Sequence, residues 1–204
     1  MKKTLILSYT PRENSNTKKM LDFFIENNQE KTEITFVDLA EEAPDLLLKE
    51  NLNLYVNRNF GGAALTDEQQ KVLAKNDKMM QQLLDTDFVV LASPMYNFSI
   101  PATVKAWFDA VIQAGKTFGY TETGIKGLCE DTKALILMTS GSDFGMEPYK
   151  SVNFATPFLI TAFDFLGIPA EAINKFGMIQ YADKSDQMIA EAIIDIKRIS
   201  DKWY

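Results

Sequence analysis

Strands that are apolar at nearly every position, each followed by a helical segment, constrain this chain more than any other feature of its sequence. Residues 87–92 spell Asp-Phe-Val-Val-Leu-Ala, and residues 133–139 spell Lys-Ala-Leu-Ile-Leu-Met-Thr. An apolar strand without polar alternation is typical of a sheet that is covered on both faces. Since helical patterns separate the strands, the sequence predicts right-handed βαβ units, a parallel sheet and the α/β class.

Five strands and the helices between them can be assigned along the chain. We expect strands over residues 3–7, 33–37, 87–92, 133–139 and 176–181. We expect helical segments after a polar loop at residues 8–17, within residues 39–54, and over residues 66–84, 101–114, 158–166 and 186–203. Thr66 and Ser99 are suited to accept N–H bonds at the starts of two of these helices. Five such strands predict a doubly wound sheet of order 2-1-3-4-5 with helices on both faces.

The composition favours one domain. The chain has 204 residues, of which 46% are hydrophobic, so we expect a single domain over residues 1–204. No run of about twenty apolar residues is present to cross a bilayer, and the apolar stretch after Lys3 is too short for a secretory signal. We therefore expect a soluble, cytoplasmic protein. Its net charge of -7 disfavours nucleic acids and anionic membranes as partners, because binding to them depends on clustered lysine and arginine.

The sequence contains no histidine, which excludes several kinds of chemistry. Ser-His and Cys-His hydrolysis need an imidazole as the base, and His-ligated zinc or iron sites need it as a ligand. The single cysteine, Cys129, can form no internal disulfide and has no histidine partner. We interpret it as a packed residue. We expect neither a hydrolase nor a metal site.

Three loops follow the first, third and fourth expected strands. They span residues 8–17, 93–102 and 140–145. These strands are neighbours in the order 2-1-3-4-5, and open α/β sheets bind their ligands at the carboxyl ends of the strands. The three loops are therefore expected to meet at one edge of the sheet and to form one binding site.

The first loop has the donors that a phosphate group needs. Ser15, Asn16 and Thr17 stand at a helix start, where side chains and backbone N–H groups can bind an anion that the helix dipole attracts. Ser8 can add another donor. The alternative is that Ser15 or Asn14 is only a helix cap. The chain lacks the Walker pattern and lacks G-x-G-x-x-G after its first strand, which argues against a nucleoside triphosphate or a Rossmann dinucleotide.

The second and third loops are suited to a flat ring. Met95, Tyr96 and Phe98 can pack against ring faces and edges. Asn97 and neighbouring backbone N–H groups can reach the pyrimidine end of a flavin and stabilise its reduced, anionic form. The third loop offers a close backbone approach and polar atoms at four positions: Ser140, Gly141, Ser142 and Asp143.

Each of these features also has a structural interpretation. Tyr96 or Phe98 taken alone is more readily a core residue beside an ordinary turn, and the third loop by itself is only a turn. A phosphate site beside a flat site, however, matches flavin mononucleotide (FMN).

The motifs in these loops resemble those of the FMN-dependent NADH-azoreductases, a branch of the flavodoxin-like quinone reductases. The resemblance covers most of the chain up to about Gly167 and rests on Ser8, residues 15–17, 93–102, 115–124 and 139–141, Lys105 and Trp107-Phe-Asp109. It implies a flavodoxin-like fold, bound FMN, NADH as the electron donor, and an azo compound or a quinone as the acceptor.

The resemblance further implies a homodimer in which residues of both chains wall the substrate pocket. Phe60, Phe118 and Tyr120 are the candidates for these walls, although Phe118 can equally be an interior residue. The family's loop after the fourth strand usually carries a serine, a basic residue and two glycines. This chain has Ser140-Gly-Ser-Asp143 there and so departs from the family pattern.

We therefore expect an enzyme with ping-pong kinetics, in which NADH delivers hydride to N5 of FMN and an azo compound or quinone then takes it. No catalytic side chain is assigned, because the flavin carries the chemistry and water or Tyr120 could supply the proton. Two other functions stay open, a flavodoxin-type one-electron carrier and a non-catalytic FMN-binding protein. Arg12 or Arg58 could meet the 2′-phosphate of NADPH, although each is more simply a surface charge.

Overall fold

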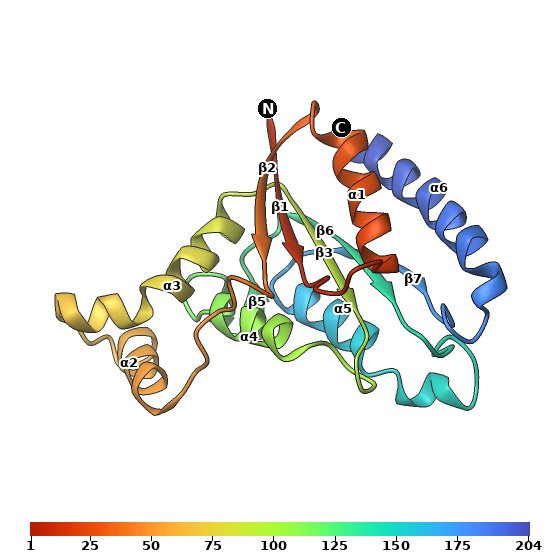
Figure 1. The fold of residues 1–204 in the computed structure, drawn as a ribbon. Coiled ribbons are helices and arrows are strands. Elements are labelled where there is room, and N and C mark those ends of the chain that lie inside the picture. The colour runs from red at the N-terminus through yellow and green to blue at the C-terminus, as the bar shows by residue number, and fades with distance from the viewer.

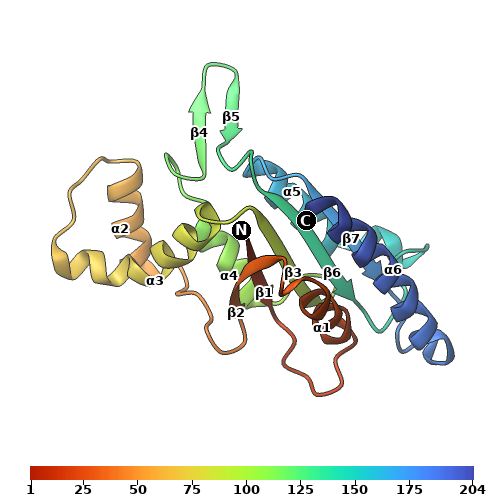
Figure 2. The same ribbon diagram turned by 90° about the horizontal axis from the view of Figure 1, so that it is seen from above.

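The computed structural model describes residues 1–204 and is built around a five-stranded parallel sheet (Figure 1). In sheet order its strands are β2 (Thr32–Asp38), β1 (Lys2–Ser8), β3 (Phe88–Pro94), β6 (Lys133–Thr139) and β7 (Ala170–Lys175). All neighbouring pairs are parallel. This is the predicted order 2-1-3-4-5, because β4 (Phe118–Thr121) and β5 (Gly124–Gly127) pair only with each other, in an antiparallel hairpin that projects from the sheet (Figure 2).

Helices cover both faces of the sheet. On one face, α1 (Asn16–Asn28) and α6 (Ser185–Trp203) lie side by side (Figures 1 and 2). The other face carries α3 (Asp67–Leu84), α4 (Ala102–Val111) and α5 (Ala155–Phe165). The remaining helix, α2 (Lys49–Asn59), packs on α3 at the periphery, and short 3-10 turns lie at Tyr149–Val152 and Ala182–Lys184. None of the helices combines the length and the apolar character that crossing a bilayer requires.

The continuous apolar character of the strands follows from burial on both faces. Side chains alternate along β1, so Leu5 and Leu7 join the cluster under α3, α4 and α5, whereas Ile6 joins the cluster under α1 and α6. All three side chains are buried. Burying an aliphatic side chain of this size contributes roughly 1.5–3 kcal/mol relative to leaving it in water. The helices can pack on both faces of the sheet because the strands carry apolar side chains on both faces.

Side-chain caps begin α1 and α3. The Ser15 hydroxyl accepts a hydrogen bond from the Lys18 N–H at 3.2 Å. Thr66 accepts from the Gln69 N–H at 3.3 Å, and the Gln69 side chain accepts from the Thr66 N–H at 3.0 Å. This reciprocal pair is a capping box, and it confirms the predicted helix start at Thr66.

The predicted cap of α4 at Ser99 is wrong. The cap is Pro101, which makes no side-chain hydrogen bond to the helix. Ser99 instead exchanges two backbone hydrogen bonds of 3.0 Å with Tyr96. These bonds hold Ser99 in the preceding turn, so its hydroxyl is not at the helix start.

The same helix ends before Ala114, where the sequence placed its last residue. Its last residue is Val111, because the Thr117 hydroxyl donates to the Val111 carbonyl at 2.7 Å and the Gln113 N–H donates to Thr117 at 2.9 Å. The threonine thus takes the place of the next helical hydrogen bonds. The Thr117 side chain, which lies beyond α4, therefore determines where this helix ends. Helix propensity along the sequence could not reveal this contact.

The fifth strand lies earlier in the sequence than predicted. It spans Ala170–Lys175, whereas residues 176–181, which were expected to be a strand, form a loop and turn. Gly177 within that loop has φ +83°, a left-handed conformation that interrupts extended backbone. As an edge strand β7 tolerates the polar residues Glu171 and Asn174, so its apolar signal is weak.

We predict that Ile136→Ala, in the middle of β6, lowers the free energy of unfolding by about 2–5 kcal/mol, because it deletes fully buried groups and leaves a cavity. Ile194→Ala on α6 is the matched control. Its side chain is 68% exposed, and the expected change is less than about 0.5 kcal/mol. Urea unfolding followed by circular dichroism measures both. Equal effects of the two substitutions would contradict two-sided burial of the sheet.

Candidate functional site

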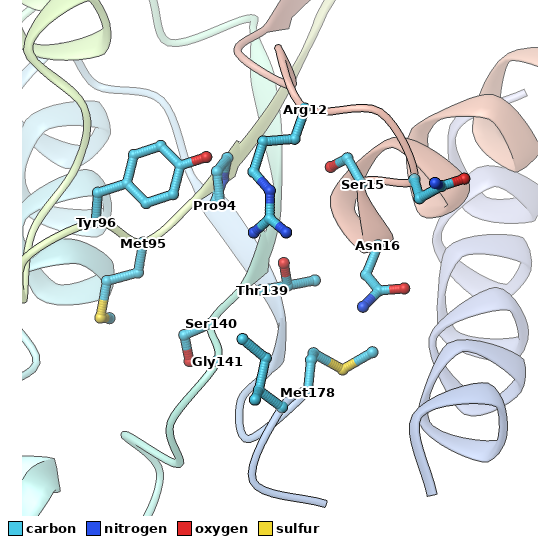
Figure 3. A pocket seen from close by; sticks show the side chains of 12 residues that line it. Arg12, Ser15, Asn16, Pro94, Met95, Tyr96, Thr139, Ser140, Gly141 and Met178 are labelled. Carbon is cyan, nitrogen blue, oxygen red and sulfur yellow. The ribbon is translucent and has the colours of Figure 1, made fainter. Parts of the chain in front are cut away.

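The loops after β1, β3 and β6 meet around one cavity at the carboxyl edge of the sheet (Figure 3). The part of this cavity that water-sized molecules can occupy is about 100 Å³, and the cavity opens to solvent. Twelve residues line it: Arg12, Asn14, Ser15, Asn16, Pro94, Met95, Tyr96, Thr139, Ser140, Gly141, Met178 and Ile179. The structure thus brings the three predicted loops together.

Thr139 connects the three loops. Its hydroxyl lies 2.8 Å from the Thr17 hydroxyl in the first turn of α1. Its carbonyl accepts the Met95 N–H at 2.8 Å, and Thr139 is itself the last residue of β6 before the third loop. Both threonines are buried, where a hydroxyl without a partner costs about 1–3 kcal/mol. The relative positions of the loops therefore depend on this residue.

The start of α1 offers unpaired backbone donors. The N–H groups of Asn16 and Thr17 have no acceptor within the chain, as is usual in the first turn of a helix. The Ser15 hydroxyl accepts the capping bond and can still donate its own proton. Asn14, with φ +57°, brings the loop into the helix through a left-handed residue. Donors that converge at the positive end of a helix dipole form a site for a phosphate or another anion.

The turn after β3 has a second pair of unpaired N–H groups. Two backbone hydrogen bonds between Tyr96 and Ser99 close the turn. Asn97 and Phe98 within it have φ +48° and +71°, a left-handed conformation that few residues other than glycine and asparagine adopt and that is frequent at functional sites. Their N–H groups have no acceptor within the chain. They are therefore free to bind ligand atoms that carry negative charge.

The third loop is paired with the loop that follows β7. The Gly141 carbonyl accepts the N–H groups of Ile179 and Gln180, each at 3.0 Å, and the Ser140 carbonyl accepts the Met178 N–H at 2.9 Å. A Cβ atom at Gly141 would lie only 3.0 Å from Cδ1 of Ile179. A larger residue at Gly141 would therefore displace Ile179 from the cavity wall.

Half of the predicted cofactor-binding residues lie on the cavity wall: Ser15, Asn16, Met95, Tyr96, Ser140 and Gly141. The others belong to the same loops but do not line the cavity: Ser8, Thr17, Asn97, Phe98, Ser142 and Asp143. Ser8 is buried and its hydroxyl lies 3.0 Å from that of Thr10, while Asp143 accepts the Gly145 N–H at 2.8 Å. The role of these residues in cofactor binding stays a prediction.

Several wall residues were not among the predicted cofactor contacts. Met178 and Ile179 were missed because residues 176–181 were assigned to a strand; Gly177 was the available signal, since a glycine inside a strand pattern often marks a break. Arg12 was interpreted as a surface charge or a contact for NADPH. Arg12 lies in a polar loop that precedes a helix, and this position was the sequence signal that could have placed it at the cavity.

The three aromatic residues proposed for the substrate pocket do not line this cavity. Phe118 is buried and packs against Phe165, with ring centroids 5.0 Å apart. Interior packing accounts for it. Phe60 and Tyr120, by contrast, are 52% and 68% exposed. Phe60 packs edge to face on Tyr55, with ring centroids 6.1 Å apart, at the end of α2.

Arg58 is already paired within the chain. Its guanidinium donates two hydrogen bonds to Asp77, of 2.6 and 2.8 Å, and a third to the Gln113 side chain at 3.2 Å. Hydrogen bonding to Asp77 raises the pKa of Arg58 above its ordinary value. The pair joins α2 to α3, so a structural role accounts for Arg58 without an NADPH phosphate.

Metal-dependent chemistry and catalysis by a cysteine thiolate lack the side chains that they need. No three Asp, Glu, Cys or His side chains lie close enough together to hold a metal ion. Cys129 is buried, and burial raises the pKa of its thiol from 9.0 to about 11. The thiolate is the nucleophilic form, so Cys129 is held in its unreactive form at neutral pH.

A doubly wound sheet with a ligand cavity at the ends of three neighbouring parallel strands defines a flavodoxin-like protein. Residues 2–199 match the sequence profile of the Flavodoxin_2 family, whose description is a flavodoxin-like fold. The chain belongs to this family, and the predicted fold class is confirmed.

Similar proteins extend over most of the chain. The FMN-dependent NADH:quinone oxidoreductase 2 of Bacillus cereus strain ZK / E33L is 33% identical over 198 residues, which are 95% of this chain and 94% of that protein. The FMN-dependent NADH:quinone oxidoreductase of Aeromonas salmonicida strain A449 is 38% identical over 160 residues, 76% of this chain and 75% of that protein.

Solved structures agree with this similarity. An azoreductase from Bacillus anthracis strain Sterne has a TM-score of 0.89 and 26% identity, and the match covers 99% of this chain and 100% of that one. An FMN-dependent NADH-azoreductase from Bacillus anthracis strain Ames Ancestor, solved in complex with FMN, has a TM-score of 0.86 and 26% identity over 98% of this chain and 99% of that one. The predicted resemblance to azoreductases and quinone reductases is confirmed.

We predict that a thiol reagent leaves Cys129 unmodified in the folded protein at pH 8 and modifies it rapidly in denaturant, because burial disfavours the thiolate. Between about pH 9 and 11 the unfolded chain loses this proton before the folded chain does, so stability falls as pH rises through that window. Absorbance of the released reagent and urea unfolding against pH measure the two effects. Rapid labelling of the native protein would show that the thiol is accessible and ionised.

Proposed function

We propose that this chain binds FMN in the cavity between the three loops and uses NADH to reduce quinones or azo compounds. The observation that carries the proposal is one cavity with an anion site on one side and an apolar wall on the other. Figure 3 shows Met95 and Tyr96 on one side and Ser15 and Asn16 on the opposite side. The names of the similar proteins, FMN-dependent NADH:quinone oxidoreductase and azoreductase, support the same function.

The residues present fit a flavin mononucleotide. A phosphate ester is an acceptor with about two negative charges at neutral pH, and the unpaired N–H groups of Asn16 and Thr17 at the start of α1 suit it. A flavin ring is flat, apolar on its faces and polar at one edge. Met95 and Tyr96 supply apolar contacts on the cavity wall. Asn97 follows them in the same loop outside that wall, and its unpaired N–H group is a donor for the polar edge of a ring that extends beyond the cavity.

FMN, when bound, supplies the hydride acceptor and donor that no side chain provides. The residues of the chain bind and orient it. The N–H groups of Asn97 and Phe98 are donors for the edge of the ring that gains negative charge on reduction. Met95 and Tyr96 cover apolar surface and keep water away from it. Since the chain has no histidine, we infer that water supplies the proton that accompanies each hydride.

The proposal includes a homodimer, and it retains the cytoplasm as the location expected from the sequence. Phe60 and Tyr120 are exposed, and so are Leu52 and Val56 of α2. Apolar residues gathered on one surface commonly mark an interface. The helix α2 protrudes from the sheet in Figures 1 and 2, and the β4–β5 hairpin protrudes from it in Figure 2. Association through them would bring the aromatic side chains of one copy to the cavity of the other and complete a substrate pocket.

We predict that the protein reconstituted with FMN is yellow, and that NADH added without oxygen bleaches it because the ring accepts a hydride. Menadione or an azo dye should then restore the colour. Visible absorbance measures each step, and light scattering measures the dimer. Colour that persists with NADH would contradict the hydride step and would favour a one-electron carrier or a non-catalytic FMN-binding protein.

We predict that Asn97→Val weakens FMN binding about tenfold, because a β-branched residue is strained by roughly 1–3 kcal/mol at φ +48°. Asn97→Gly is the matched control, since glycine adopts this conformation freely and keeps the N–H group. Titration of flavin fluorescence measures both affinities. Normal affinity in the valine variant would remove this turn from the cofactor site, and weak binding in the glycine variant would assign the contact to the Asn97 amide.

A further inference from the structure

We propose that Arg12 binds the phosphate group of FMN and makes the cavity selective for phosphorylated over unphosphorylated flavin. The inference rests on the proposed function and adds to it a residue of the loop between β1 and α1. A guanidinium group presents a planar fork of N–H donors that matches phosphate oxygens. It would add charge and direction to the backbone donors at the start of α1.

Arg12 is the one charged residue among the twelve that line the cavity. Figure 3 shows its side chain extending from the loop into the cavity, with the guanidinium between Pro94 and Ser15 and directed toward Thr139. Asn16, whose N–H group is unpaired, lines the same side as Ser15. The guanidinium therefore faces the space into which the helix start directs its donors.

Arg12 has no acidic partner within the chain. Of the two other arginines, Arg58 is bonded to Asp77, and Arg198 lies 3.6 Å from Asp195. No ion pair or hydrogen bond joins the Arg12 side chain to any residue, although the chain carries a net charge of -7. An unpaired arginine in a polar cavity is placed to meet the negative charge of a ligand.

No lysine near the cavity can replace this charge. Lys18 pairs with Asp22 at 2.6 Å, and Lys19, the next residue of α1, is exposed. Neither of them lines the cavity. The third loop, residues 140–145, contains no lysine or arginine. Positive charge from side chains thus comes from Arg12 alone, in addition to the dipole of α1.

The competing explanation is that Arg12 is an ordinary solvated charge, since it is exposed. A solvated charge acts only through the screened field around the protein. Its removal would then have the same effect as removal of neighbouring Lys19. Direct contact predicts instead an effect that depends on the phosphate of the ligand. Riboflavin, which has the same ring and no phosphate, separates the two explanations.

The experiment compares Arg12→Gln with Lys19→Gln, a matched control that removes one positive charge beside the same helix start. We expect Arg12→Gln to weaken FMN binding about tenfold, the size of one charged hydrogen bond, and to change riboflavin binding less than about twofold. The affinity of Arg12→Lys for FMN should lie between those of Arg12→Gln and the wild type, because lysine keeps the positive charge but lacks the planar fork of N–H donors. Lys19→Gln should leave both affinities near those of the wild type. Quenching of flavin fluorescence gives all the dissociation constants.

Salt gives a second readout. Raising the ionic strength from about 0.05 to 0.5 M should reduce the preference of the wild type for FMN over riboflavin more than that of Arg12→Gln, because salt screens the charge that the variant lacks. Circular dichroism confirms that the variants are folded, which is expected for changes at exposed positions.

The outcomes distinguish this inference from the proposed function. If Arg12→Gln weakens FMN and riboflavin equally, weakens neither, or has no more effect than Lys19→Gln, the role of Arg12 is overturned and FMN binding stands. If the wild-type protein binds neither flavin, the proposed function is overturned and the inference with it.

Discussion

Thr139 joins the parts of the molecule on which the cavity depends. Its hydroxyl contacts Thr17 of α1, its carbonyl accepts the Met95 N–H, and the third loop begins immediately after it. The parallel register makes this possible, because Pro94 at the end of β3 pairs with Thr139 at the end of β6. Strands that run in one direction end at one edge, so the three loops are positioned relative to one another before any ligand is present.

Hydrogen-bond donors that favour an anion lie together at the cavity, although the protein as a whole is acidic. The overall charge of -7 repels anions at long range, yet the N–H groups at the start of α1 and the guanidinium of Arg12 lie at one place. At contact distance such donors outweigh the screened field of distant carboxylates. What the cavity can bind therefore depends on local geometry, and net charge is informative mainly about the partners that it disfavours.

Phe60 and Tyr120, the two exposed aromatic residues proposed for the substrate pocket, do not line the cavity and lie at the periphery. Phe60 follows α2, which the Arg58–Asp77 ion pair holds against α3, and Tyr120 lies on the β4–β5 hairpin. One copy of the chain thus carries a cavity suited to the cofactor on its sheet, and carries the apolar surface proposed for the substrate on elements that protrude from it. This separation is the structural reason for including a second copy in the proposed function.

Local patterns in the sequence were sufficient for the fold class, the strand order and the three loops. The strand over residues 133–139 is where the sequence placed it, because burial on both faces requires a continuous apolar run. The sequence alone misplaced the fifth strand, since an edge strand with Glu171 and Asn174 has less apolar character than residues 176–181. Only the tertiary structure decided which arginine is paired and which faces the cavity, because each arginine's partner, or lack of one, depends on residues distant in the sequence.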